Sequence, residues 1–584
     1  MNIEEIKLKL PKHLVRYIVE QDYSRYTSID QAAWRYIMRR LFNFLSRNAH
    51  SCYQSGLTRS GIEIERIPNI EIMNRSLQKF GWRAVPVSGF IPPSAFMELQ
   101  SLSILPIASD MRSIDHLLYT PAPDIVHEAA GHAPILVDKR YAAYLKKYAQ
   151  IAKKAIISSE DIELYESIRA LSDAKEDPNS SAGDIKKAED QLNRVSKSIS
   201  HISEAGYLGR MNWWTAEYGL IGSLKQPKIF GAGLLSSAEE AESCLNPSVK
   251  RIPLSIDCIN YSYDITEPQP QLFVTPSFKH LENVLKELSD QMAFKTGGSA
   301  GLNKALQSKT VNTVQFSSGL QVSGILSRVY KNAAEDEAVY LNFSGPCQLC
   351  LNYRVLTGQG VGQHPKGFGS PVGKLRGIKK PIEKFGASEL RKFNLAPKKN
   401  ATLIFTSGVC VEGQVVSITK ENGKIIIISF EKCTVRRGTD LLFDPSWGVY
   451  DMAVGEKVTS VFAGPADRNH YHDSPDFNVK IIPRGVPDEK AKRLMSLYAR
   501  VREIREKKLF ALAIVKEMKS MMGELISDFP NDWLLSLEVF ELAFSQKIFG
   551  DIRETAHGHL KQLSKLNPKF KDPIDEGLIL IISH

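Results

Sequence analysis

Two histidines that lie five positions apart constrain the local fold of this chain more than any other feature. His127 and His132 occur in residues 119–134 (YTPAPDIVHEAAGHAP), a largely apolar stretch that begins with a proline-rich turn. Neutral imidazole is the commonest protein ligand for first-row metals, so the pair suggests a metal site. On an ordinary α-helix five residues turn by about 500°, which leaves the two side chains about 140° apart. A shared metal therefore requires a helix end or a local bulge, and Gly131 makes such a distortion less costly.

The same spacing argues against a zinc peptidase. A zinc-peptidase helix carries His-Glu-x-x-His, with its two histidines at positions i and i+4 facing one metal. Glu128 follows the first histidine here, but the i+4 position is Gly131. Two histidines that are satisfied by hydrogen bonds at a helix end remain the alternative to a metal site, and a metal would need a third ligand.

The length and charge of the chain limit its domain count and its partners. Its 584 residues are too many for one ordinary core, so we expect two to four domains. The formal charge of +10 is spread over 75 basic and 65 acidic residues, which permits an anionic partner without indicating one. Basic and aromatic residues do not interleave densely, and no nucleic-acid motif is present. We therefore expect no nucleic acid among the partners.

Cysteine usage and hydropathy predict a cytoplasmic protein. Seven cysteines are scattered from Cys52 to Cys433, an odd number that suits a reducing compartment better than a disulfide framework. The N-terminal residues lack the basic start and apolar segment of a signal peptide, and no run reaches the roughly 18 apolar residues of a membrane span. We expect no membrane association.

A candidate for the third metal ligand lies about 90 residues after the histidines. Glu217 occurs in residues 211–220 (MNWWTAEYGL), a segment that is otherwise aromatic and apolar and that we expect to be helical. A buried carboxylate is costly unless it is paired or binds a cation. Two histidines and one carboxylate are the ligand set of non-haem Fe(II) oxygenases, which keep open coordination positions. A partly exposed Glu217 beside two tryptophans is the alternative, and residues 229–237 (IFGAGLLSS) predict a glycine-rich loop close to a ligand.

These segments together resemble the pterin-dependent aromatic amino acid hydroxylases, the family of phenylalanine, tyrosine and tryptophan hydroxylases. The resemblance rests on residues 119–134, on 213–220 (WWTAEYGL) and on 231–237 (GAGLLSS). Residues 263–270 (YDITEPQP) and 277–278 (SF) fit the end of the same catalytic domain. The resemblance covers about residues 20–292 and is nearest to the bacterial phenylalanine hydroxylases.

The resemblance assigns roles to individual residues. It implies that His127, His132 and Glu217 hold Fe(II), that Glu128 is an acidic catalytic residue near iron and pterin, and that Arg112 pairs with the substrate carboxylate. Further residues would line the amino acid pocket: Thr120, Pro123, Trp213, Tyr218, Gly233 and Ser236. Others would contact a tetrahydropterin similar to tetrahydrobiopterin: Ile91, Pro93 and Phe96, the last as the stacking aromatic, together with Glu128.

The resemblance implies hydroxylation of the ring of an aromatic amino acid by O2, and we expect the conversion of phenylalanine to tyrosine. Tyrosine or tryptophan hydroxylation within the same family stays open, because few pocket residues decide between these substrates. A scaffold or binding protein, whose second half carries the role, is an alternative of another class. The chain departs from the animal enzymes in having only about 20 residues before the matching region, and in a longer insertion at about 158–204.

Taken in order, the sequence predicts a multidomain protein. Residues 1–295 form a mainly α-helical hydroxylase domain, with a fixed-shape loop at 85–93 (VPVSGFIPP), a short strand at 101–108 and a helical insertion at about 158–204. Residues 300–485 are rich in strand-forming residues, and 314–324 (VQFSSGLQVSG) resembles 403–413 (LIFTSGVCVEG), which predicts a duplicated β-barrel or sandwich. Residues 487–584 have helical spacing, and we expect the whole second half, from about residue 300, to bind a partner or a second copy.

Overall fold

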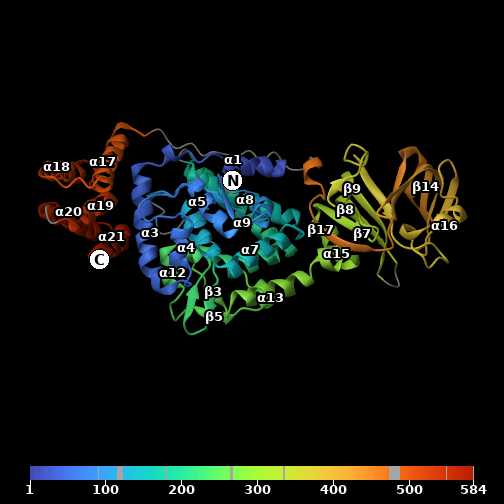
Figure 1. Cartoon of the computed structure of the whole chain (residues 1–584), viewed down its shortest axis with the longest axis horizontal. Helices are drawn as coiled ribbons and strands as arrows, with labels where there is room; N and C mark the ends of the chain where they lie inside the picture. The colour runs from blue at the N-terminus through green and yellow to red at the C-terminus, as the bar shows by residue number, and fades with distance from the viewer. Residues whose placement is uncertain are drawn as a thin grey trace.

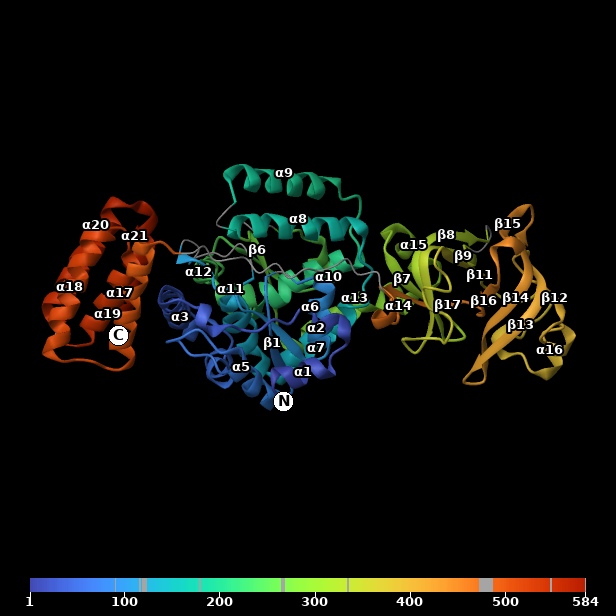
Figure 2. The same cartoon turned by 90° about the horizontal axis from the view of Figure 1, so that it is seen from above.

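The computed structural model describes residues 1–89, 91–114, 117, 123–177, 180–263, 268–332, 336–471, 487–546 and 549–582. Three bodies lie in a row (Figures 1 and 2), with the first 297 residues in the middle. The β-rich region lies at one end of the row, and the C-terminal helices lie at the other end. Within the described ranges, no helix combines the length and the apolar character needed to cross a membrane.

The central body is mainly helical, as predicted. Its α-helices are α1 (Ile3–Lys9), α2 (Lys12–Val15), α3 (Ser28–Asn48), α4 (Tyr53–Arg59), α5 (Ile70–Leu77), α6 (Pro93–Ser101), α7 (Lys139–Ala152), α8 (Ser159–Glu176), α9 (Ala182–Ser198), α10 (Glu204–Asn212), α11 (Ala232–Ser236), α12 (Ala238–Ser243), α13 (Phe278–Asp290) and α14 (Ala293–Thr296). Helices α8 and α9 pair as a hairpin that projects from this body (Figure 2), in the segment where the sequence predicts a helical insertion.

Two small sheets complete the central body. In the first, β1 (Arg83–Val87) pairs in parallel with β2 (Ile104–Ala108). The second has the order β4 (Pro227–Ile229), β3 (Leu220–Gly222), β6 (Gln271–Thr275), β5 (Lys250–Pro253). Both sheets are short, so helix packing supplies most of the core.

Helix α3 is the longest helix of the central body, and its sequence explains both its start and its burial. Thr27 caps it, because the Thr27 side chain accepts from the Asp30 main-chain N–H while the Asp30 carboxylate accepts from that of Thr27. Its buried residues include not only apolar side chains but also Arg35 and Arg40. A helix with apolar and charged side chains buried on several sides needs partners on several sides. The rest of the central body and the C-terminal helices supply these partners.

Two predicted loops are wrong in part. Residues 85–87 belong to strand β1 rather than to a loop, since four consecutive buried positions and a parallel partner strand outweigh the single proline in the strand. Residues 232–236 form the short helix α11 rather than a loop. Gly231 precedes α11 at φ −70°, so its role is not left-handed backbone but close packing: a Cβ there would lie 2.4 Å from the main-chain oxygen of Glu217.

The β-rich region consists of two antiparallel sheets joined to the central body through helix α15 (Gly298–Ser308). The first contains β7 (Val311–Phe316), β8 (Leu320–Lys331), β9 (Ala338–Leu351), β10 (Arg354–Val355), β11 (Gly367–Pro371) and β17 (Val458–Ala463). The second contains β12 (Asn400–Ile404), β13 (Val409–Glu421), β14 (Lys424–Arg437), β15 (Asp440–Phe443) and β16 (Tyr450–Ala453). The similar segments 314–324 and 403–413 form equivalent hairpins, whose turns contain Gly319 and Gly408 at φ +99° and +83°.

The C-terminal residues are helical, as their spacing predicts. The helices are α17 (Glu489–Glu506), α18 (Leu512–Asp528), α19 (Trp533–Phe544), α20 (Gly550–Leu566) and α21 (Pro568–Ile582). Their buried side chains belong to the same hydrophobic cluster as the core of the central body. Tyr36 of α3 packs edge-on against Trp533 of α19, with ring centroids 5.2 Å apart. Its hydroxyl donates to the main-chain oxygen of Pro573 at 2.9 Å.

Candidate active site

The segment with the two histidines forms a π-helical turn, η4 (Val126–His132). In a π-helix the main-chain hydrogen bonds run over five residues instead of four, so positions i and i+5 come close to the same side. The predicted local distortion is therefore confirmed. The rings of His127 and His132 have centroids 5.1 Å apart and meet at 85°.

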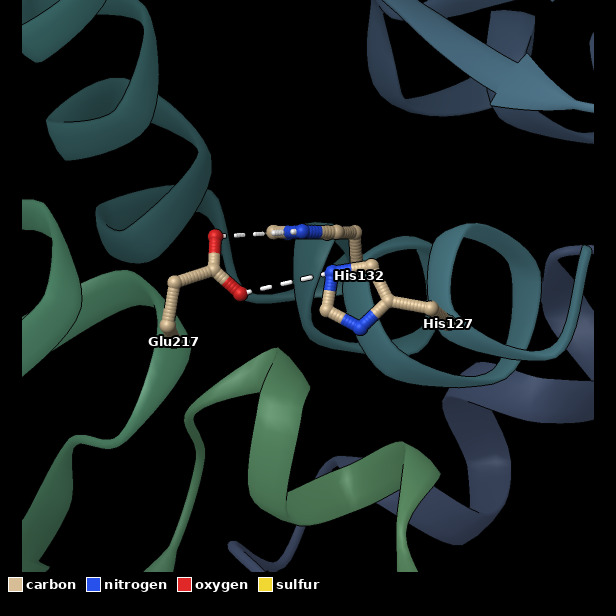
Figure 3. Close-up of side chains that lie close together, drawn as sticks. All are labelled: His127, His132 and Glu217. Carbon is tan, nitrogen blue, oxygen red and sulfur yellow. Dashed lines mark ion pairs between the residues drawn. The ribbon is translucent and has the colours of Figure 1, made fainter. Parts of the chain in front are cut away.

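Glu217 ends a second π-helical turn, η6 (Trp213–Glu217), and points at both histidines (Figure 3). Its Oε2 lies 3.4 Å from Nε2 of His127, and its Oε1 lies 3.4 Å from Nε2 of His132. One ligand atom from each residue lies within 4.8 Å of the other two. The structure thus brings together the three side chains that the sequence singled out, although more than 80 positions separate Glu217 from the histidines.

Glycines allow the two π-helical turns to pack against α11. A Cβ on Gly131 would lie 2.6 Å from the main-chain oxygen of Ala232, so only glycine fits between η4 and α11. A Cβ on Gly233 would lie 2.9 Å from the ring of Tyr218. The sequence interpretation of Gly131 as a residue that eases distortion is therefore incomplete, because the structure also requires it for close helix contact.

Hydrogen bonds from two further residues orient His127 and Glu217. Nδ1 of His127 lies 3.1 Å from Oγ of Ser236, which leaves Nε2 facing Glu217. Nδ2 of Asn212 donates to Oε1 of Glu217 at 3.2 Å. Such outer partners fix the ring orientation and the carboxylate geometry of metal ligands. Asn212 was not singled out from the sequence, since an asparagine in a helix gives no sign of what it faces.

Burial and the neighbouring imidazoles shift the pKa values of Glu217 and Glu128 in opposite directions. Burial alone would raise the pKa of Glu217, but His132 and His127 together hold that pKa well below its ordinary value. Burial raises the pKa of Glu128 to about 8, with His132 opposing the shift and the Glu217 charge adding to it. Oε2 of Glu128 lies 4.0 Å from Nε2 of His132 and has no hydrogen-bond partner among the described residues.

Arg112 is buried and paired with a carboxylate of the chain itself. Its Nε and Nη2 donate to the two oxygens of Asp124 at 2.6 and 2.8 Å. Asp124 also accepts from the main-chain N–H of His127 at 3.0 Å, so it links the arginine to the start of η4. Asp124 was not singled out from the sequence. Its place three residues before His127, directly after a proline, is the pattern of a helix-capping aspartate and could have revealed it.

Aromatic side chains stack beside Glu217. The ring of Trp213 stacks with Tyr218 and with Tyr263, at centroid distances of 4.5 and 4.2 Å. The Tyr218 hydroxyl donates to Oε2 of Glu240 at 2.5 Å. Two of the predicted pocket residues, Trp213 and Tyr218, are therefore held in place by neighbours that the sequence did not identify.

The remaining predicted residues differ in how close they lie to the trio. Ser236 contacts His127, Gly233 contacts the Tyr218 ring, Pro123 is half-buried next to Asp124, and Thr120 lies outside the described residues. Of the expected pterin residues, Ile91 is buried and Phe96 half-buried in a second apolar cluster with side chains of α1 and α2, while Pro93 is the exposed first residue of α6. This cluster differs from the core around His127, His132 and Glu217, the three residues that we call the metal trio.

The donor set fits a divalent iron ion. Ligand atoms on adjacent corners of an octahedron about 2.1 Å from a metal lie about 3 Å apart, close to the 3.4 Å from each glutamate oxygen to its histidine. Nitrogen and carboxylate ligands in a set of three suit iron that keeps open positions. Imidazoles that bind a metal are neutral, so a metal ion at this site would supply the countercharge of the partly buried Glu217 carboxylate.

Comparison with known proteins identifies the central body. The family model of the biopterin-dependent aromatic amino acid hydroxylases matches residues 15–165 and 192–297. A phenylalanine-4-hydroxylase of Mesorhizobium japonicum is 28% identical over 276 residues, 46% of this chain and 83% of the relative. That of Pseudomonas aeruginosa is 26% identical over 282 residues, 48% of this chain and 90% of the relative.

Among solved structures, a phenylalanine hydroxylase of Chromobacterium violaceum with bound iron(III) and 7,8-dihydrobiopterin is 26% identical. The match covers 47% of this chain and 85% of that one, with a TM-score of 0.38. The family match leaves out residues 166–191, which fall in the α8–α9 hairpin, and all residues after 297. The region from residue 15 to residue 297 thus belongs to the biopterin-dependent aromatic amino acid hydroxylase family.

Proposed function

We propose that the chain is an Fe(II)- and tetrahydropterin-dependent monooxygenase that hydroxylates the ring of an aromatic amino acid, phenylalanine to tyrosine. The observation that carries the proposal is the convergence of His127, His132 and Glu217, whose ligand atoms lie within 4.8 Å of one another. The names of the relatives support the reaction and the choice of phenylalanine. The seven free cysteines support a cytoplasmic location.

His127, His132 and Glu217 would hold the iron on one face. Bound Fe(II) together with a tetrahydropterin supplies the reductive activation of O2 that ring hydroxylation requires. Ser236 and Asn212 keep two of the three ligands in position, through Nδ1 of His127 and Oε1 of Glu217. The close packing of η4 on α11 at Gly131 supports this frame from behind.

Arg112 would bind the carboxylate of the amino acid while it stays paired with Asp124. Asp124 occupies Nε and Nη2, so the substrate would use Nη1, which donates to no described residue. The pair fixes the guanidinium plane before substrate arrives, and pre-organised donors lower the entropic cost of binding. Trp213 and Tyr218, with Pro123, Thr120 and Gly233, would shape the ring pocket beside Glu217.

Glu128 would act beside the iron and the pterin. Its carboxyl is buried next to His132, and its Oε2 has no hydrogen-bond partner among the described residues. A buried oxygen of this kind is available to a bound molecule, because leaving it unpaired is costly. Ile91, Pro93 and Phe96 would contact the pterin ring, with Phe96 stacking on it.

The deciding experiment is product analysis. Purified full-length protein is supplied with Fe(II), tetrahydrobiopterin, O2 and phenylalanine, tyrosine or tryptophan in turn. We expect tyrosine from phenylalanine at the highest rate and no product with the Glu217→Ala variant. Faster turnover of tryptophan or tyrosine would keep the proposed reaction but change the assigned substrate. The absence of any hydroxylated amino acid, despite bound iron, would refute the proposed activity.

A further inference from the structure

A cavity of about 530 Å³ lies on the central body between the C-terminal end of α3, the β3–β4 hairpin and the first turns of α7 and α13. Its polar lining comes from four separate elements and includes Arg47, His50, Arg140, Lys228 and Ser277. Among the residues that the structure describes, no carboxylate lines it. Cavities of this size accommodate small molecules. Basic side chains from distant parts of the sequence therefore meet at one concave surface.

The cationic groups of the cavity are incompletely paired. The Arg47 guanidinium makes no ion pair with any residue in the described ranges. Lys228 donates through Nζ to the main-chain oxygen of Arg47, which leaves two of its three hydrogens for another acceptor. Arg140 pairs at 3.3 Å with Asp138, the cap residue of α7. Of these three cations, only Arg140 has a carboxylate partner in the described ranges, which leaves an excess of positive charge.

Neutral donors point to the same kind of ligand. The main-chain N–H and the Sγ of Cys52 lie 3.5 and 3.1 Å from Nδ1 of His50, which places the hydrogen of a neutral imidazole on Nε2. Ser277 caps α13, a helix of 13 residues, by accepting from the main-chain N–H of His280. The first N–H groups of a helix have no partner within it and carry a partial positive charge. An anion in the cavity would meet these donors together with the three cations.

We propose that this cavity binds the phosphate group of a small phosphorylated molecule. A phosphate dianion offers several strong acceptor oxygens to guanidinium, ammonium and helix N–H donors at once. The cavity is larger than a phosphate group needs, so it has room for the body of a phosphate monoester. This site differs from the metal trio in its residues and in its chemistry, and it does not rest on the proposed hydroxylase activity.

The position of the cavity connects it with the frame of the metal site. Strand β3 begins three residues after Glu217, and β4 leads directly into Gly231 and α11, which carries Ser236. The main-chain N–H of His50 donates to the oxygen of Ile229 at 2.8 Å, so the end of α3 is already tied to this hairpin. A phosphate held by Arg47 and Lys228 would clamp the hairpin against α3. We expect binding to stabilise the folded chain.

The test is calorimetric titration of the full-length protein with glycerol phosphate and, separately, with inorganic phosphate, each at constant ionic strength set with sodium chloride. We expect saturable binding of about one molecule per chain and a rise in melting temperature that chloride does not produce. Tighter binding of glycerol phosphate would assign the site to a phosphate monoester, and equal binding would assign it to free phosphate.

Two variants locate the binding. Arg47→Gln and Lys228→Gln each remove one cation and should weaken the affinity about tenfold or more, since hydrogen bonds to charged groups are strong. Both side chains are exposed, so the fold should survive these changes. Lys225→Gln is the matched control: Lys225 is an exposed lysine on the same hairpin that does not line the cavity. Absence of saturable binding, or an equal loss in the control, would overturn the proposal.

Discussion

The two regions that follow the hydroxylase domain join it in opposite ways. The C-terminal helices share one hydrophobic core with the central body. The β-rich region has cores of its own, and the first of these takes in only Ile156 and Ala293 from the first 297 residues among the described side chains. The β-rich region and the C-terminal helices follow each other in sequence but lie at opposite ends of the molecule (Figure 1).

The contacts at the two junctions differ accordingly. At the helical junction, Arg35 of α3 donates to both oxygens of Glu538 of α19, at 3.1 and 2.6 Å, and both side chains are buried. At the β-rich junction, Arg468 donates to Glu98 of α6 at 2.9 Å, where His13 also binds at 3.0 Å. These side chains are 15 to 23% exposed. The first junction resembles a domain interior, and the second resembles a polar interface between domains.

The largest effect should follow from breaking the buried pair. Glu538→Ala leaves Arg35 buried without its countercharge, which costs about 3–5 kcal/mol. Thermal unfolding followed by calorimetry should show a large fall in melting temperature. Glu554→Ala, an exposed glutamate of α20, is the control and should change little. A small effect of Glu538→Ala would mean that the helices do not depend on this pair for their docking.

The same pair predicts loss of stability in acid. Burial alone would raise the pKa of Glu538, but Arg35 and Arg505 hold it at about 2, below its ordinary value of 4.5. Because the folded pKa is lower than the unfolded one, the stabilisation is complete above pH 4.5 and is lost as the pH falls towards 2. The difference in stability between the parent protein and Glu538→Ala should shrink over this range. A constant difference would contradict the assignment.

A smaller effect should come from overfilling the shared core. Gly577 of α21 faces α3 and α19, and a Cβ there would lie 2.6 Å from Leu537 and 3.4 Å from the Tyr36 ring. Gly577→Leu should cost about 1–3 kcal/mol by overpacking. Gly558→Leu is the control, because a Cβ at Gly558 of α20 meets nothing within 4 Å. Equal melting temperatures of the two variants would argue against tight docking of α21.

The smallest effect on stability should come from the β-rich junction. Arg468→Ala removes a partly exposed ion pair, worth about 1 kcal/mol or less. Helix α6 carries Phe96 and Glu98 two residues apart, so loss of this contact should raise the KM for tetrahydropterin about twofold to fivefold and leave kcat unchanged. Arg354→Ala, an exposed arginine of the same region, serves as the control. An unchanged KM would show that the β-rich region does not position α6.

The sequence predicts residues whose chemistry is local and misses those that depend on tertiary contact. The spacing of His127 and His132 was enough to predict a distorted helix, and Glu217 was recognised from its apolar surroundings. The contacts of Asn212 and Ser236 with these groups, and the pairing of Asp124 with Arg112, are visible only in the structure, because each depends on how distant segments pack.

The arrangement of the regions was also beyond the sequence. Hydrophobic spacing predicted the C-terminal helices, yet Arg35 and Glu538 are 503 positions apart, and no local pattern connects them. A partner-binding role for the second half of the chain stays a prediction. Much of the apolar face of the C-terminal helices already packs on α3 of the same chain. The loop expected at 229–237 is a short helix, because glycine there serves packing rather than a turn.

The most direct test of the account is the iron content of two matched variants. The parent protein, Glu217→Ala and Glu128→Gln are loaded anaerobically with Fe(II), freed of unbound metal and measured by atomic emission spectroscopy. We predict about one iron per chain in the parent and in Glu128→Gln, and less than about a tenth of that in Glu217→Ala, since only Glu217 completes the ligand set. Full iron retention by Glu217→Ala, or loss of iron from Glu128→Gln alone, would contradict the proposed metal site.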